Sequence, residues 1–143
     1  MSEYKISVVP ANMIECIWHM VEPIIKRPID LSHDEVTLEV AKETLMNGGI
    51  MLVVITKKAK IIAINTLEVR TFPTGKKVLY IPLTGGDDLD CWMDAFIKTA
   101  TQIALGYNCT HLRGLAVRDG WLRKLKHLGF EPISTTIEME IEK

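Results

Sequence analysis

A glycine-rich turn is the stretch of this sequence best suited to bind an anion. Thr84, Gly85 and Gly86 lie between an apolar run and a long helical pattern. Glycines let a ligand approach the backbone, and the first amides of a helix lack internal partners, so this turn can bind a phosphate. Asp87 and Asp88 follow at once, and their charges repel an anion at close range. An ordinary capped helix behind a Gly-Gly turn is therefore the alternative interpretation.

A cluster of positive charge lies further along the chain, on a predicted short helix. Such cations normally fill the solvent-exposed side of a helix. Alternatively, they supply the cationic contact that the acidic turn lacks, to a nucleotide cofactor or to a polyanionic partner. The residues of this basic patch are Arg118, Arg123, Lys124, Lys126 and His127.

Other kinds of catalytic site have little support in the spacing of residues. Cys109 and His111 form the one close Cys/His pair, and a zinc site needs three or four ligands, so we expect no metal. No serine occupies the Gly-x-Ser-x-Gly elbow of hydrolases. With Cys16 and Cys91, the cysteines are odd in number and widely spaced, which is typical of reduced thiols packed among apolar neighbours.

Length and charge limit the classes of function. A chain of 143 residues suits one domain with one core, spanning residues 1–143. Seventeen Lys and Arg against eighteen Asp and Glu give a net charge of −1, which argues against nucleic acid and anionic lipid as partners. The longest apolar run, residues 50–55, is too short to span a membrane, and residues 1–15 do not read as a signal peptide. We expect a cytoplasmic protein.

The first third of the chain predicts one strand and two helices. Residues 4–9 alternate polar and apolar side chains, as in a short half-buried strand. A helical pattern follows and should end at Pro23, because proline cannot continue a helix. Ser32 and Glu35 form a capping box, which predicts that a second helix begins directly after Ser32 and ends at Gly48.

The middle of the chain changes to β-rich runs. Residues 50–56, 60–70 and 77–83 read as three antiparallel strands joined by short turns. Apolar residues at i, i+3, i+4 and i+7 then predict a long helix over residues 89–107. A strand at residues 111–117 follows, and the strand, helix, strand unit should be a right-handed parallel crossover.

The end of the chain predicts a short helix and a last strand. Asp119 can cap the helix and Gly129 can end it. Residues 133–142 alternate, with Ile137, Met139 and Ile141 on one face and glutamates on the other. This strand is either a sheet edge guarded by charge or a surface that pairs with a second copy in a homodimer. The order β-α-α-β-β-β-α-β-α-β predicts an α/β (α+β) fold, a central mixed sheet with helices on both faces.

This order and the closing sequence resemble the GNAT N-acyltransferases, which move an acyl group from acetyl-CoA to an amine. The stretch from Trp121 to Pro132 is similar to the closing helix of that family and its Gly-Phe-Glu signature. More narrowly, the Gly-Gly loop, Trp92 and the Arg-x-Gly-Trp motif that ends at Trp121 resemble compact GNAT-like proteins often encoded by bacteriophages. That resemblance implies a location in the host cytoplasm or the virion.

The resemblance implies that acetyl-CoA binds in a splay between the fourth and fifth strands. The pantetheine arm would pair with the fourth strand, and the pyrophosphate would lie on the loop before the long helix. This chain departs from the family pattern, since the loop lacks a cation and Pro82 removes one amide donor. The cofactor-binding residues implied are Ile81, Leu83, Thr84, Gly85, Gly86, Asp87 and Asp88.

The catalytic groups are less well defined. The tyrosine that commonly protonates the leaving thiolate in the family corresponds to Leu125, which cannot donate a proton. A transferase also needs a base for the proton of the incoming ammonium. Glu68, Tyr80 and His111 are the titratable residues expected near the splay; we rank His111 first, because an imidazole titrates near neutrality, and Tyr80 next. A strand histidine satisfied by a neighbour is the alternative.

Two functions from different classes are therefore left open. The first is an acetyl-CoA-dependent N-acyltransferase, in which a small-molecule or protein amine attacks the thioester and backbone amides polarise its carbonyl. The second is a catalytically inactive GNAT-like module for binding or virion association, because a fold does not determine a function. A nucleic-acid binder that uses the basic patch is a third reading, and the net charge argues against it.

Overall fold

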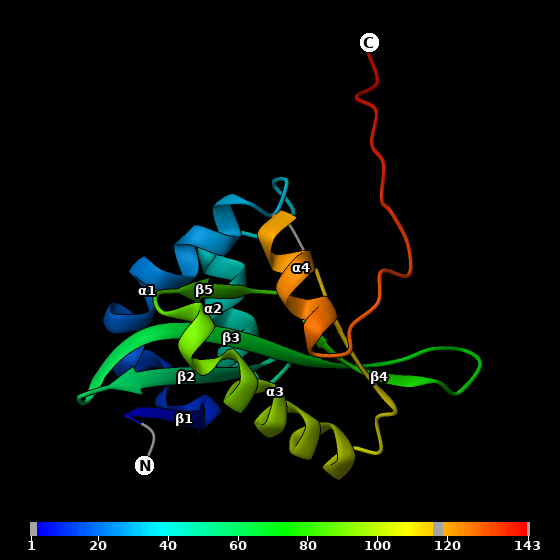
Figure 1. The fold of residues 1–143 in the computed structure, drawn as a ribbon. Helices are drawn as coiled ribbons and strands as arrows, with labels where there is room; N and C mark the ends of the chain where they lie inside the picture. Colours follow the sequence, from blue (N-terminus) through cyan, green and yellow to red (C-terminus); the bar gives the residue numbers. More distant parts are fainter. Residues whose placement is uncertain (1–2, 116–118, 143) are drawn as a thin grey trace.

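A mixed β-sheet forms the centre of the protein, whose computed structural model describes residues 3–115 and 119–142 (Figure 1). The strand order is β1-β2-β3-β4-β6, and β5 pairs with β3 beyond the end of β4. All pairs are antiparallel except β4 and β6, which are parallel, so the parallel pairing of the predicted crossover is confirmed. The strands are β1 (Tyr4–Val9), β2 (Met51–Lys57), β3 (Lys60–Thr71), β4 (Lys77–Ile81), β5 (Thr84–Gly86) and β6 (His111–Gly114).

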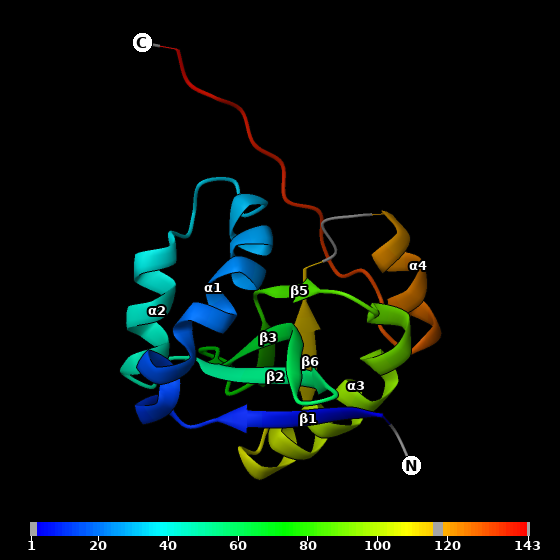
Figure 2. The same ribbon diagram turned by 90° about the vertical axis from the view of Figure 1, so that its left-hand side faces the viewer.

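Helices cover both faces of this sheet, as predicted (Figure 2). One face carries α1 and α2, and the other carries α3. In the part of the chain that the structure describes, no helix is long and apolar enough to cross a membrane. The helices are α1 (Ile14–Asp30), preceded by a 3-10 turn at Ala11–Met13, α2 (Leu38–Met46), α3 (Leu89–Gly106) and α4 (Asp119–His127).

Each face of the sheet has its own apolar core. Leu52 and Val54 of β2 pack against α1 and α2, whereas Val53 and Ile55 pack against α3. Because successive side chains of a strand point to opposite faces, a strand buried on both sides needs a continuous apolar run rather than an alternating one. This explains the apolar sequence of β2.

The first helix does not end at Pro23, so that prediction was wrong. Helix α1 continues through Pro23 and Pro28 to Asp30. Ile25 and Ile29 extend its apolar stripe and are both buried, and this packing offsets the amides that the prolines lack.

The second helix begins later than predicted. Helix α2 starts at Leu38, and the Thr37 hydroxyl caps it by accepting a hydrogen bond from an amide of the first turn at 3.1 Å. His33 and Asp34 have φ angles of 57° and 61°, in the left-handed region, so no helix can run through them. Ser32 therefore closes a turn at the end of α1 instead of capping α2.

The fourth predicted strand is shorter than expected, and the turn predicted after it is a strand instead. Strand β4 ends at Ile81, before Pro82, and the glycine-rich turn of the sequence forms β5, which pairs with β3. Strand β6 is also shorter than expected and ends at Gly114, while residues 116 and 117 lie outside the described part. The chain therefore leaves the sheet between β4 and β5 and returns to it three residues later.

The predicted last strand is absent from the described chain. Residues 131–142 pair with no strand and extend away from the body of the protein (Figures 1 and 2). Ile137, Met139 and Ile141 are exposed. An alternating pattern indicates a strand with one buried face, but it does not identify the partner that buries that face.

Replacing Gly86 with alanine should destabilise the protein by about 2–4 kcal/mol, because it combines backbone strain with a steric clash. Gly86 has a φ of 126°, and an added Cβ would overlap the Ala63 Cα. Urea unfolding measures the change. Gly106→Ala is the control, since nothing lies within 4 Å of an added Cβ there; equal stability of the two variants would contradict the packing of β5 on β3.

Candidate functional site

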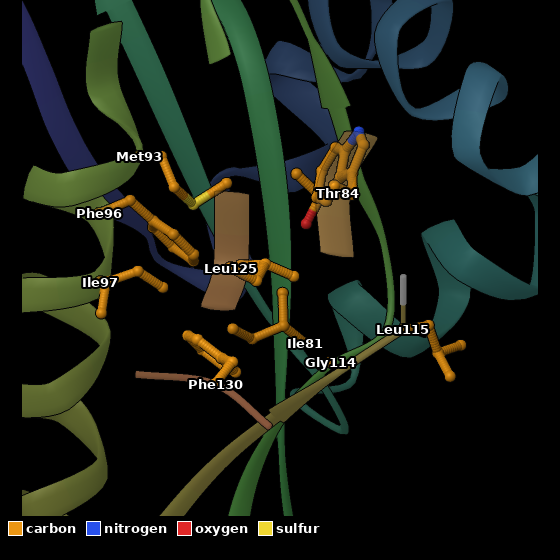
Figure 3. A pocket seen from close by; sticks show the side chains of 10 residues that line it. Ile81, Thr84, Met93, Phe96, Ile97, Gly114, Leu115, Leu125 and Phe130 are labelled. Atoms are coloured by element: carbon orange, nitrogen blue, oxygen red, sulfur yellow. The ribbon is translucent and has the colours of Figure 1, made fainter. Parts of the chain in front are cut away.

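The pairing of β4 with β6 ends at Ile81 and Gly114, and a small cavity lies at that point. Its volume is about 20 Å³, which is room for one water molecule. Figure 3 shows Phe96, Leu125 and Phe130 converging on Ile81, whereas Leu115 points away. The remaining lining residues are Thr84, Met93, Ile97, Gly114 and Trp121.

The backbone of β5 directs polar groups toward the same opening. The Leu83 carbonyl accepts a hydrogen bond from β3 at 2.9 Å, and the Asp87 amide donates one to β3 at 3.0 Å. Alternate residues of an antiparallel strand face its partner, so Leu83, Gly85 and Asp87 direct their polar groups at β3. Thr84 and Gly86 then direct theirs to the opposite edge, beyond the end of β6.

The carboxylates after β5 are paired with side chains from other elements. Each pair joins the loop to a distant part of the sequence, so no local sequence pattern contains these partners. The negative charge of the loop is thus largely offset. The contacts are Asp87 to Arg27 at 3.3 Å, Asp88 to Lys57 at 3.6 Å and to the Tyr4 hydroxyl at 3.0 Å, and Asp90 to Lys124 at 2.9 Å.

The start of α3 is held by backbone conformation and by Trp92. Asp88 has a φ of 59° and its side chain makes no capping hydrogen bond, so the carboxylate does not occupy the first amides of the helix. The Trp92 Nε1 donates to the Asp87 carbonyl at 2.8 Å, and its buried ring packs edge-to-face on Phe96. Trp92 therefore holds the loop through the hydrogen bond to Asp87 and does not line the cavity.

A buried amide supports Thr84 from the neighbouring strand. The Thr84 hydroxyl donates to the Asn65 Oδ1 at 2.7 Å, and Asn65 is fully buried. The Asn65 Nδ2 has no hydrogen-bond partner in the described structure. Buried donors are rarely left unpaired in folded proteins, so this nitrogen can bind a water or a ligand group beside Thr84.

The two residues ranked first for catalysis do not line the cavity. His111 is exposed at the start of β6, and its Nδ1 lies 2.7 Å from the Thr110 hydroxyl. In the register of β4 and β6, Tyr80 and His111 share one face of the sheet, while Ile81 points into the cavity on the other. His111 also lies about 10 Å along the strand from Gly114.

Tyr80 belongs to a small polar cluster on the face of the sheet opposite the cavity. The Arg70 guanidinium lies 3.9 Å from the centre of the Tyr80 ring and forms an ion pair with Glu68 at 3.1 Å. Burial raises the pKa of Tyr80, with a smaller opposing contribution from Arg70. The phenol is therefore protonated at neutral pH and can donate a proton or a hydrogen bond, but it is not a base.

Tyr4 joins the loop to the first strand. A hydrogen bond with the Cys91 thiol raises the pKa of Tyr4, and burial and Asp88 raise it further.

Cys91 and Cys16 are exposed and only Cys109 is buried, so the expectation of three packed thiols was wrong for two of them. Within the described ranges, no three His, Cys, Asp or Glu residues lie close enough together to hold a metal ion.

The basic patch is only partly described. Lys124 is paired with Asp90, whereas Arg123, Lys126 and His127 are exposed on α4. Arg118 lies outside the described residues.

Comparisons with solved structures identify proteins of the same architecture, although no family model and no curated protein matches the sequence. An aminoglycoside acetyltransferase from an uncultured soil sample, in complex with trehalose, is 14% identical with a TM-score of 0.68, and 97% of each chain is covered. A predicted acetyltransferase from Clostridium acetobutylicum, with acetyl-CoA, is 16% identical with a TM-score of 0.68, over 96% of each chain. The ribosomal-protein-alanine N-acetyltransferase of Brucella melitensis biovar Abortus 2308 is 10% identical with a TM-score of 0.67, over 96% of this chain and 99% of that one. The chain therefore has the mixed α/β fold of the GNAT acetyltransferases.

Proposed function

We propose that this protein is an acetyl-CoA-dependent N-acyltransferase that acetylates an amine of a small molecule or a protein. The observation that supports the proposal most directly is the edge of β5, where Thr84 and Gly86 direct backbone amides past the end of β6. An extended ligand can add to such an edge as a further strand. The similar Clostridium acetobutylicum structure contains acetyl-CoA, which is consistent with that ligand.

The residues around this edge fit the proposed co-substrate. Thr84 and Gly86 would hold the pantetheine amides, and the first turn of α3 would lie next to the pyrophosphate. Arg27 and Lys57 offset the carboxylates of the loop and are themselves half-exposed, so they can also contact phosphate oxygens. Leu83 and Gly85 have a supporting role, because their polar groups face β3.

The cavity must widen before a thioester arm can enter. A volume of about 20 Å³ holds one water molecule and no more. Trp121 and Leu125 are half-buried on α4 and form one wall of the cavity. We propose that binding moves these side chains outward, with α4 acting as the mobile wall.

Acetyl-CoA supplies the activated acetyl group, and the protein orients it and excludes water. Backbone amides of β5 would position the thioester for attack by an amine. Water would take the proton of the attacking amine, and, because Leu125 supplies no proton, water would also protonate the departing thiolate.

Calorimetric titration with acetyl-CoA tests the proposal. We expect one site, and we expect Asp87→Asn to bind acetyl-CoA about fivefold more tightly, because it removes a negative charge near the phosphates and frees Arg27. Asp94→Asn is the control, since Asp94 is exposed further along α3 and undergoes the same change of charge. A folded wild-type protein that shows no heat and no thermal shift at millimolar acetyl-CoA would contradict the enzyme and leave a non-catalytic binding module.

Leu125→Tyr should raise the rate of acetyl transfer about 100-fold, because it places a proton donor for the thiolate at the cavity. Leu125→Phe is the matched control, with the same ring and no hydroxyl. Release of the CoA thiol is measured with sisomicin, which a similar soil acetyltransferase structure contains, and with an alanine peptide as probe amines. Equal rates in the two variants would show that no thiolate lies near position 125.

A further inference from the structure

Two neighbouring polar side chains of the sheet have no polar partner among the described residues. Tyr80 of β4 and Arg113 of β6 are opposite each other in the parallel register, on the face of the sheet opposite the cavity. Tyr80 is only 8% exposed, and within the described chain its hydroxyl makes no hydrogen bond. Arg113 is half-buried, and its guanidinium forms neither an ion pair nor a hydrogen bond there. Buried polar groups are normally paired, so these two can bind a ligand.

Neighbouring side chains hold both groups in place. The Arg70 guanidinium lies 3.9 Å from the centre of the Tyr80 ring, and Glu68 holds Arg70 through their ion pair at 3.1 Å. The Arg113 guanidinium stacks on the ring of Phe72, 5.0 Å from its centre. Side chains that are already ordered lose little freedom when a ligand binds.

A small molecule can reach these groups without displacing a helix. The apolar core on this face takes residues from α1, α2, β2 and β3 but, in the part of the chain described, none from β4 or β6. Figure 1 shows α1 and α2 near β5, away from the hairpin that joins β3 to β4. The Tyr80 hydroxyl is not a fully enclosed atom, so the small exposed part of Tyr80 includes it.

The chemistry of the two groups specifies an acceptor with one negative charge. A guanidinium only donates hydrogen bonds, and burial raises the pKa of Tyr80, so the phenol also donates at neutral pH. Arg70 and Arg113 lower that pKa, whereas carboxylates raise it, those of Glu68 and Glu35. Negative charges thus match the positive charges around the phenol, which disfavours a dianion such as phosphate and admits a monoanion at Arg113.

We propose that Tyr80 and Arg113 form a binding site for the carboxylate group of a small molecule. The planar fork of Arg113 donates to the carboxylate oxygens, and the Tyr80 hydroxyl donates to one of them. This carboxylate site lies one register position before the pairing of β4 with β6 ends, on the face opposite the cavity. It goes beyond the proposed function, because it binds its ligand without acetyl-CoA.

A titration with benzoate, followed by the backbone amide spectrum without acetyl-CoA, tests this site. Benzamide is the matched ligand, with the same ring and a neutral amide in place of the carboxylate. Benzoate should shift the amides of Tyr80 and Arg113 to saturation, and benzamide at equal concentration should not. Inorganic phosphate should bind at least about tenfold more weakly than benzoate.

Substitutions in the site should weaken the binding of benzoate. Arg113→Gln should raise the Kd at least about tenfold, because it removes the charged donor, and Tyr80→Phe about fivefold, because it removes one hydroxyl. Arg123→Gln is the control, since it loses the same charge at an exposed position of α4 and should bind as the wild type does. Circular dichroism verifies that each variant folds.

Several results would overturn the carboxylate site and leave the acetyl-CoA titration unaffected. These are no saturable binding of benzoate, equal binding of benzamide, tighter binding of phosphate, or shifts confined to Thr84 and the start of α3. Equal affinities of Arg113→Gln and Arg123→Gln would overturn it too. If Arg113→Gln does not fold, Tyr80→Phe decides, and a folded Tyr80→Phe variant with wild-type affinity would contradict the proposal.

Discussion

The return of the chain to β3 after Pro82 is the constraint on which the site depends. Two buried hydrogen bonds hold this return: the Leu83 amide donates to the Thr66 hydroxyl at 3.1 Å, and the Thr66 amide donates to the Leu83 carbonyl at 2.9 Å. Because β5 is aligned with β3 and not with β6, the sheet opens beyond the point where the pairing of β4 with β6 ends. Without this return, β4 would continue beside β6 and the edge amides would be used within the sheet.

Packing on both faces keeps β5 in place. On one face Gly85 touches α1, where an added Cβ would lie 2.7 Å from the Pro28 side chain. On the other, Trp92 holds the carbonyl of Asp87. The unexpected continuation of α1 through its prolines is therefore part of the site, because the end of that helix supports the strand that carries the binding amides.

Local patterns predicted most of the fold. The apolar stripe of α3 and the strands around short turns follow from periodicity within a few residues. The parallel crossover follows from the order strand, helix, strand. The pairing of Asp87 with Arg27 joins residues sixty positions apart, and no local pattern contains it. The extension of α1 past Pro23 follows from burial of Ile25, which propensity does not include. The alternation of apolar and polar side chains over residues 133–142 predicts a strand, but such a pattern cannot specify which surface would pair with that strand.

The most direct test of this account is the backbone amide spectrum of the protein during titration with acetyl-CoA. If the edge of β5 holds the pantetheine arm, the amide protons of Thr84 and Gly86 should shift and become protected from exchange, while the amides of Leu83 and Gly85 stay bonded to β3 and change little. Shifts confined to the exposed face of α4, with Thr84 and Gly86 unchanged, would contradict the account.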